Sequence, residues 1–141
     1  MKIAVVGSEG MLGRDLSSYL ASRHEVVGLD IDDIDICQRE QTAARIDELR
    51  PQLIINCAAC VDVESCETEP ERAFRVNALG SQNLAIAAQR SNADYLYFSS
   101  DYVFDGTSGC DYDEFASPGP VNQYGRSKLA GEILALSLIH I

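Results

Sequence analysis

The stretch IAVVGSEGMLG, residues 3–13, decides the fold class. Its apolar part, Ile3–Val6, is typical of a buried strand, and three glycines follow it at intervals of three residues. Apolar residues then recur at helical spacing, which predicts a helix over Met11–Ala21. A strand that turns through glycines directly into a helix is the first unit of a parallel sheet covered by helices.

The glycine turn is a predicted phosphate-binding site. Gly7 lets the chain turn tightly, Gly10 removes a Cβ so that the backbone can approach a phosphate, and Gly13 allows the helix to pack closely on the strand. The free N–H groups and the positive dipole end of the following helix favour an anion. Because glycines also end strands for structural reasons alone, the assignment depends on the residues that follow.

Asp30 supports a dinucleotide as the ligand of this turn. It closes the second predicted strand, Val26–Leu29, where a carboxylate accepts hydrogen bonds from an adenosine ribose. Its charge favours NAD, whereas Arg14 would soften the repulsion of a 2′-phosphate, so the sequence is compatible with both NAD and NADP. Asp35 is expected near the adenosine as well. The aspartates from Asp30 onward do not form a calcium loop, since the sixth position is not glycine and the twelfth is Gln41.

Strand and helix patterns alternate along the rest of the chain. This alternation predicts an α/β fold, a Rossmann-type doubly wound parallel sheet in three layers. The remaining predicted strands are Val26–Leu29, Leu53–Ile55 and Tyr95–Phe98. The remaining predicted helices are Arg39–Leu49, Glu71–Val76 and Leu79–Ala88 as one helix or two with a break near Gly80, and a last helix from about Gln123 to Glu132. A long loop is predicted over Asp105–Pro120.

Charge and hydropathy exclude several classes of partner. The 141 residues carry a net charge of −11, and no basic run could neutralise a nucleic acid backbone or an anionic membrane. The first apolar run is too short for a signal peptide, and no stretch is long enough to span a bilayer. The sequence therefore predicts a cytoplasmic protein that binds neither nucleic acid nor membrane.

The five cysteines predict neither disulfides nor a metal site. They are Cys37, Cys57, Cys60, Cys66 and Cys110. Their odd number and the lack of a secretion signal argue against a disulfide framework. Cys57 and Cys60 form a C-x-x-C pair, but a metal site needs further ligands and the two histidines lie far away in sequence. We therefore expect small buried thiols and no bound metal.

A tyrosine and a lysine are spaced for carbonyl reduction. Tyr124 and Lys128 are four residues apart and thus share one face of the last predicted helix. A lysine ammonium there can lower the pKa of the phenol and hold a nicotinamide ribose. Ser99 and Ser100 fall at the carboxyl end of the fourth predicted strand, where ligands bind in parallel sheets, and a hydroxyl there can orient a carbonyl.

Taken together, these segments resemble the dTDP-4-dehydrorhamnose reductase family, within the extended short-chain dehydrogenase/reductase superfamily. The G-x-x-G-x-x-G spacing of the glycine turn resembles the spacing found in that superfamily. The segments that carry the family resemblance are SSDYVFDG at 99–106, NCAA at 56–59, VNA at 76–78 and YGRSKLAGE at 124–132. The family has Tyr and Thr where this chain has Cys60 and Val61, which is the main departure.

The resemblance implies a role for each site residue. Ser100 stands where the family has its catalytic threonine, with Tyr124 as proton donor and Lys128 as cofactor anchor. Ser100, Tyr102 and Tyr124 would contact the substrate. The implied cofactor-binding residues are Gly7, Gly10, Met11, Leu12, Gly13, Asp30, Asp35, Ile36, Cys57, Ala58, Ala59, Ser99, Tyr124 and Lys128.

The implied reaction is hydride transfer from NADH or NADPH to the 4-keto carbon of dTDP-4-dehydro-6-deoxy-L-mannose, which yields dTDP-L-rhamnose. Two alternatives stay open. One is another sugar-nucleotide reductase or epimerase of the extended branch, although the turn lacks the TGGAGFIG style of epimerases. The other is a non-catalytic subunit like the regulatory subunit of methionine adenosyltransferase. Some family members use Mg²⁺, for which this sequence shows no site, and a homodimer is expected for a full-length protein.

The resemblance also predicts how the chain is organised. Residues 1–135 are expected to be an incomplete dinucleotide-binding domain, truncated before the C-terminal half that holds much of the family's sugar-nucleotide pocket. The final residues 136–141, LSLIHI, resemble the translation of a transposon end used in sequencing libraries. We interpret them as a non-native tail.

Overall fold

The computed structural model describes residues 1–139. Four parallel strands form one sheet in the order β2-β1-β3-β4, and Ala4 at its centre pairs with Val27 on one side and Ile54 on the other. The strands are β1 (Lys2–Val6), β2 (Glu25–Leu29), β3 (Leu53–Asn56) and β4 (Asp94–Tyr97). The chain winds outward in one direction from β1 to β2 and in the other from β3 to β4, so the topological switch point lies between β1 and β3.

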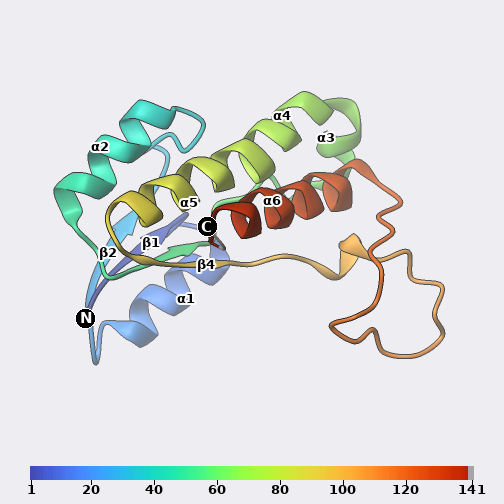
Figure 1. Ribbon diagram of the computed structural model, residues 1–141, viewed down its shortest axis with the longest axis horizontal. Coiled ribbons are helices and arrows are strands. Elements are labelled where there is room, and N and C mark those ends of the chain that lie inside the picture. Colours follow the sequence, from blue (N-terminus) through green and yellow to red (C-terminus); the bar gives the residue numbers. More distant parts are fainter. Residues whose placement is uncertain (140–141) are drawn as a thin grey trace.

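Helices cover both faces of the sheet, which confirms the three predicted layers (Figure 1). Helix α1 (Met11–Leu20) packs on one face through Leu16 and Leu20, against Ile3 and Val5. The opposite face carries α2 (Arg39–Leu49), α5 (Ser81–Arg90) and α6 (Gln123–Ile139). The larger core lies on that second face and includes Ala4, Val6, Leu29, Ile46, Ile54, Leu84, Ala87 and Ala88. None of the helices described between residues 1 and 139 is long and apolar enough to cross a bilayer.

The segment from residue 63 to residue 80 contains one helix that was not predicted and decides between two predicted alternatives. A short helix α3 (Val63–Thr68) was not predicted, and it begins at Asp62, whose carboxylate accepts a hydrogen bond from Ser65 N at 2.7 Å. Of the two alternatives for the following segment, one continuous helix is confirmed, because α4 (Pro70–Phe74) runs through the π-helix η1 (Arg75–Gly80) directly into α5 without a break near Gly80. Gly80 has helical backbone angles, and a Cβ there would lie 2.7 Å from Ile36 Cδ1. This glycine permits close packing and does not interrupt the helix.

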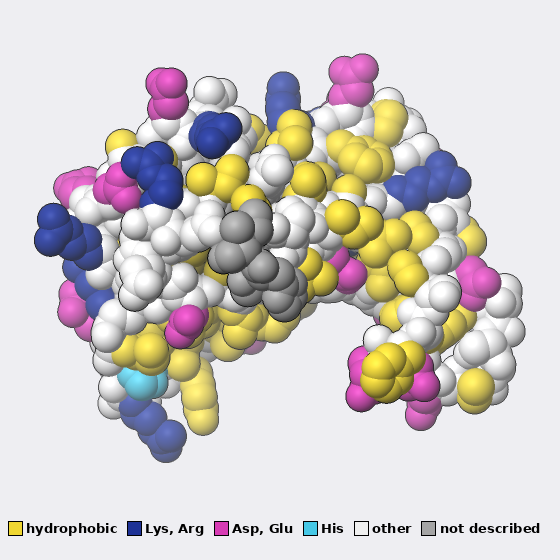
Figure 2. Space-filling model, viewed as in Figure 1, with side chains coloured by type: hydrophobic (Ala, Val, Ile, Leu, Met, Phe, Trp, Pro, Cys, Tyr) yellow, Lys and Arg dark blue, Asp and Glu magenta, His cyan; other side chains and the backbone are white. Residues whose placement is uncertain are grey.

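The connection between β4 and α6 consists of a 3₁₀ turn and a long loop. A single 3₁₀ turn, η2 (Asp101–Val103), follows β4, and no helix or strand is described between it and α6, as predicted for the long loop. The loop projects from the body of the protein, and Figure 2 shows acidic and apolar side chains together at its tip. Phe115, which belongs to this loop, is 88% exposed. In the predicted tail, residues 136–139 continue α6, whereas residues 140 and 141 lie outside the described part of the chain.

Candidate active site

A cavity of about 350 Å³ opens at the carboxyl ends of β1 and β3, at the switch point of the sheet. Most of the predicted cofactor-binding residues come together there: Gly7, Gly10, Asp30, Asp35, Ile36, Cys57, Ala58 and Ala59. Sequence reasoning did not predict the other seven lining residues, which are Val6, Ile31, Ile34, Cys37, Cys60, Arg72 and Val76. Arg72 and Val76 come from a segment that only the folded chain brings to the cavity, so no local pattern marks them.

The three glycines of the turn have different structural roles. Gly7 has a φ of +79°, and a Cβ on it would lie 2.6 Å from the backbone N of Ala58. A Cβ on Gly13 would lie 2.1 Å from the carbonyl oxygen of Gly7. The nearest atom to a Cβ on Gly10 is 3.3 Å away, so a small side chain would fit the protein but would enter the cavity. Gly7 and Gly13 are therefore needed for the fold, and Gly10 keeps space open for a ligand.

The N-terminus of α1 fits a phosphate. Its N-cap is Gly10, which offers no side-chain hydrogen bond, and the first turn contains no acidic residue. Met11 and Leu12 do not line the cavity with their side chains, which are 86% and 42% exposed, so only their backbone N–H groups could serve a ligand. An uncapped helix beside a glycine-lined cavity is a suitable site for a dinucleotide pyrophosphate.

Asp30 holds the turn in place from the end of β2. Its Oδ2 accepts a hydrogen bond from Glu9 N at 2.8 Å, and its Oδ1 accepts one from Ile31 N at 2.8 Å. Each carboxylate oxygen has capacity for a second donor, such as a ribose hydroxyl. Arg14 lies 3.2 Å from the carboxylate of Glu9, so its charge is paired at the surface.

Lys128 is buried at the carboxyl end of β4. Only 4% of the residue is exposed, and its Nζ donates a hydrogen bond to the carbonyl oxygen of Phe98 at 2.6 Å. The same ammonium lies 4.2 Å from the centre of the Tyr97 ring. Burial lowers the pKa of Lys128 to about 8, opposed by the nearby charges of Glu132 and Cys57. Burial raises the pKa of the Cys57 thiol, which lines the cavity, and the positive charge of Lys128 opposes that shift.

The buried lysine predicts an unusual dependence of stability on pH. Below pH 8 Lys128 is charged in the folded and in the unfolded state, so the folded chain bears the whole cost of burying the charge. Between about pH 8 and pH 10.5 only the folded state has lost the proton, and the free energy of unfolding therefore rises with pH. Without ligand, we expect Lys128→Met to be about 3 kcal/mol more stable than the parent near pH 7, and the difference to vanish near pH 10.5. Urea unfolding of both chains across this range measures it. A Lys128→Met chain less stable than the parent at pH 7 would contradict the prediction.

Tyr124 and Ser100 lie on adjoining segments. The ring of Tyr124 meets that of Tyr102 edge to face, with centroids 5.5 Å apart. Ser100 Oγ donates to Asp101 Oδ1 at 3.1 Å and accepts from Tyr102 N at 3.2 Å. A Cβ on Gly125 would lie 2.1 Å from the carbonyl oxygen of Tyr102, so the first turn of α6 packs directly on η2. Ser99 and Ser100 line a separate hollow beside the acidic loop, and neither they, Tyr124 nor Lys128 lines the glycine-turn cavity itself.

Asn77 links the cavity wall to helix α6, and sequence reasoning assigned it no role. Its Oδ1 accepts from Cys60 N at 2.7 Å, and its Nδ2 donates to the Cys60 carbonyl and to Ser127 Oγ, both at 2.9 Å. Ser127 Oγ in turn donates to the carbonyl oxygen of Tyr124 at 2.7 Å. Asn77 is 1% exposed within η1. The signal available in the sequence was an amide side chain between the apolar residues Val76 and Ala78 of a predicted helix, because a buried amide needs hydrogen-bond partners.

We expect Asn77→Ala to lower the free energy of unfolding by about 3 kcal/mol, because it leaves the buried backbone groups of Cys60 and the hydroxyl of Ser127 without their partner. Asn83→Ala is the matched control. The Asn83 amide makes one hydrogen bond, to the carbonyl oxygen of Ile36, and its loss should cost about 1 kcal/mol. Urea denaturation measures the free energy of unfolding of both variants. Equal losses would contradict the prediction, because the Asn77 hydrogen bonds would then stabilise the fold no more than the single bond of Asn83.

The expectation that all the cysteines are buried is wrong. Only Cys66 is buried, Cys110 is exposed, and the others are intermediate. Cys37, Cys57 and Cys60 line the cavity and are therefore only partly covered, although Cys37 and Cys57 also pack against the core. All five are free thiols, and the described residues contain no group of three or more metal-ligating side chains.

The whole described chain matches one protein family. The family profile described as RmlD substrate binding domain matches residues 1–139. A dTDP-4-dehydrorhamnose reductase of Aggregatibacter actinomycetemcomitans is 40% identical over 139 residues, which cover 97% of this chain and 47% of that protein. A dTDP-4-keto-6-deoxy-D-glucose reductase of Streptomyces niveus is 41% identical over 136 residues, which cover 96% of this chain and 47% of that protein.

A solved structure agrees with these relatives. The dTDP-4-dehydrorhamnose reductase of Bacillus anthracis, in complex with NADP, superposes with a TM-score of 0.94 at 38% identity, covering 97% of this chain and 49% of that chain. The chain thus spans about half the length of the curated relatives it matches.

Proposed function

The chain belongs to the RmlD substrate binding domain family, and we propose that it forms the dinucleotide-binding half of an NAD(P)H-dependent reductase of dTDP-linked 4-keto-6-deoxy sugars. The observation that carries this proposal is the buried Lys128 ammonium, which lies one helical turn from Tyr124 and donates to the carbonyl oxygen of Phe98 just after β4. Burial of a lysine without a carboxylate partner is costly, and perturbed groups of this kind gather at functional sites.

The cavity supports NADP or NAD as the cofactor. The open space over Gly10 and the uncapped start of α1 would hold the pyrophosphate, and Asp30 would accept hydrogen bonds from the adenosine ribose. Asp35 and Ile36 would border the adenine, while Cys57, Ala58 and Ala59 would line the path toward the nicotinamide. When bound, the reduced dinucleotide supplies the hydride.

The side chains around α6 would handle the proton and the carbonyl oxygen. Tyr124 donates its phenolic proton to the oxygen as negative charge develops there, and the Lys128 ammonium on the same helical face favours the resulting phenolate. Ser100 orients the same oxygen, which requires its hydroxyl to turn from Asp101 toward the substrate. Asn77, through Ser127, holds the turn of α6 that carries Tyr124.

Relatives support dTDP-4-dehydrorhamnose as the substrate, with dTDP-L-rhamnose as the product. The names of the two relatives above both specify a dTDP-linked sugar with a keto group at carbon 4, but the sugar is a different one in each name. The Streptomyces relative is as similar as the first, which favours dTDP-4-keto-6-deoxy-D-glucose as the second candidate. For the longer protein we also propose a homodimer that works in the cytoplasm, where five free thiols would persist.

Two measurements test the proposed function. Titration of the chain with NADP⁺ and with NAD⁺ should show saturable binding to the cavity. A protein that contains this chain and the remaining half of a typical relative should then oxidise NADPH only when a dTDP-4-keto sugar is present. Binding of the dinucleotide without turnover, together with a stable complex with methionine adenosyltransferase, would instead favour the regulatory alternative.

A further inference from the structure

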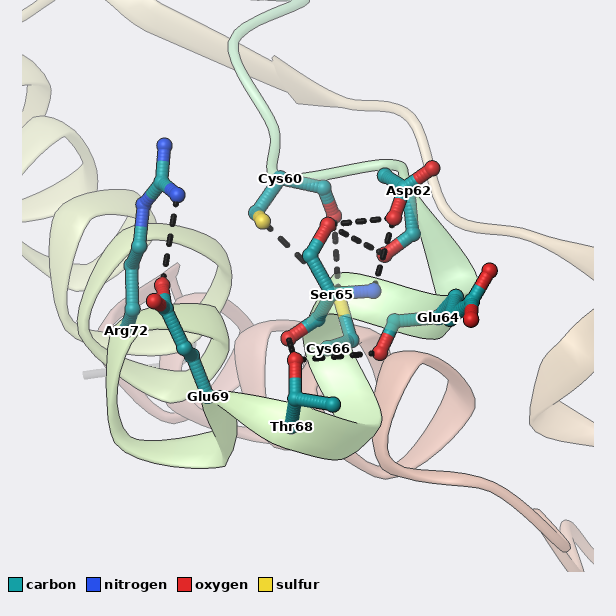
Figure 3. Close-up of polar contacts among 8 residues, drawn as sticks. All are labelled: Cys60, Asp62, Glu64, Ser65, Cys66, Thr68, Glu69 and Arg72. Atoms are coloured by element: carbon teal, nitrogen blue, oxygen red, sulfur yellow. Dashed lines mark hydrogen bonds and ion pairs between the residues drawn. The ribbon is translucent and has the colours of Figure 1, made fainter.

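Cys60 and Cys66 lie close together (Figure 3), and Cys60 lines the cavity. Their Sγ atoms are 3.7 Å apart, and the Cys66 thiol also lies 3.7 Å from the carbonyl oxygen of Cys60. Cys60 is half-buried and lines the cavity, whereas Cys66 is fully buried on α3. One sulfur of the pair can therefore be reached from the cavity, and the other cannot.

We propose that Cys60 and Cys66 are a modification site, a dithiol that a hydroperoxide oxidises to a disulfide and that a bound dinucleotide shields. The shielding rests on the proposed function, since it requires a dinucleotide in the cavity. The formation of the disulfide does not, because it follows from the contact between the two sulfurs.

The two sulfur atoms are already in van der Waals contact. The sulfurs need to approach by about 1.6 Å to reach bonding distance. Only the short segment between them, which includes the capped first turn of α3, would be enclosed by the bond. Cys57, the other half of the C-x-x-C pair, lines the same cavity and is the competing partner for Cys60.

The two thiols have different chemical roles. The Cys60 thiol gives its proton to solvent, and its thiolate attacks one oxygen of the peroxide. The O–O bond breaks and the departing oxygen takes up a proton from solvent, so the products are a Cys60 sulfenic acid and water or an alcohol. The Cys66 sulfur then attacks the Cys60 sulfur, the S–O bond breaks, and a second oxygen leaves as water. The two thiols lose two electrons in total, and the peroxide accepts them. Burial raises the pKa of the Cys66 thiol to about 11, which keeps it protonated and unreactive until the sulfenic acid forms beside it.

Both cysteines are also connected to the helix that carries Tyr124 and Lys128. Asn77 joins the backbone of Cys60 to Ser127. Glu67, which follows Cys66, accepts a hydrogen bond from Gln123 N at 2.6 Å at the start of α6. The dithiol thus lies between the cavity wall and the catalytic helix, a place where a bound dinucleotide would cover the sulfur of Cys60.

The test uses the Cys110→Ser chain, which removes the exposed thiol that would join two copies. Hydrogen peroxide is added, the chain is digested without reductant, and mass spectrometry identifies the linked peptides. We expect a Cys60–Cys66 link that persists in Cys57→Ser and is absent from Cys66→Ser, where a dimedone adduct on Cys60 appears instead. A Cys57–Cys60 link, or oxidation of neither Cys60 nor Cys66, would overturn the proposal.

The shielding is measured with NADP⁺, which peroxide does not oxidise. At a concentration about ten times its dissociation constant, NADP⁺ should slow formation of the link about tenfold, because only the unliganded fraction reacts. Binding without slower oxidation would overturn the shielding. If NADP⁺ does not bind but the link forms, the proposed function fails while the disulfide stands.

Discussion

Tyr124→Phe is expected to lower kcat for reduction of a dTDP-4-keto sugar by about 10²- to 10⁴-fold in a reductase that contains this chain, because the carbonyl oxygen loses its proton donor. The substitution removes one oxygen atom. Within residues 1–139, the hydrogen bonds that hold α6 to the rest of the chain include those from Asn77 to Ser127, from Gln123 to Glu67 and from Lys128 to Phe98, and the Tyr124 hydroxyl takes part in none of these. Dinucleotide binding and the free energy of unfolding should therefore change little. Steady-state kinetics with NADPH, together with NADP⁺ titration, separates the two effects.

Tyr19→Phe is the matched control for this substitution. Tyr19 is 68% exposed and lies on α1, which covers the face of the sheet opposite to α6. We expect its kcat to equal that of the parent. If Tyr124→Phe reduced the keto sugar at the parent rate, the assignment of Tyr124 as proton donor would be wrong, and another acid would have to be sought around Ser100.

Gly13→Ala is expected to have the largest effect on folding, a loss of about 3–5 kcal/mol in the free energy of unfolding. The added Cβ would lie 2.1 Å from the carbonyl oxygen of Gly7 and 2.8 Å from Cα of Ser8. Both are backbone atoms of the turn, so no side chain can rotate to relieve the clash. Helix α1 would have to move away from β1. Urea denaturation followed by circular dichroism measures the loss.

Gly10→Ala provides the contrast within the same turn. Its Cβ would meet only the carbonyl oxygen of Gly7, at 3.3 Å, so the chain should lose less than about 1 kcal/mol of stability. Because the methyl group enters the space left for the pyrophosphate, the affinity for NADP⁺ should fall by at least about tenfold, or ~1.4 kcal/mol. If Gly10→Ala bound NADP⁺ normally, the phosphate would lie elsewhere.

The sequence predicted the parts of the fold that depend on local patterns. All four strands and α2 were found close to their true bounds, because each is a run of regular periodicity between turn residues. Helix α3 was missed because it is short, and its capping aspartate lies in a stretch without apolar periodicity. The sequence left the effect of Gly80 open between one helix and two, because a glycine can break a helix or allow close packing, and its packing partner, Ile36, is visible only in the structure.

The candidate site was predicted unevenly for a similar reason. The glycine turn, Asp30 and the spacing of Tyr124 and Lys128 are local or helical patterns, and most of the predicted cofactor residues line one cavity. Contacts between distant segments leave no such pattern. The link from Cys60 through Asn77 to Ser127, and the contact between Cys60 and Cys66, exist only because α3, η1 and α6 pack together.

The π-helix between α4 and α5 sets a limit on how genes for such a chain can diverge. Each residue added to a helix rotates the following part by about 100°, and the π-helix η1 contains one residue more than an α-helical turn. This extra residue sets the rotation between Asn77, which faces α6, and Leu84, which is buried in the core under the sheet. Loss of a single codon within residues 75–80 would restore an ordinary helix but rotate one of these faces away from its partner. We therefore expect lineages to exchange the exposed side chains at Arg75 and Leu79 freely while keeping the length of this segment fixed.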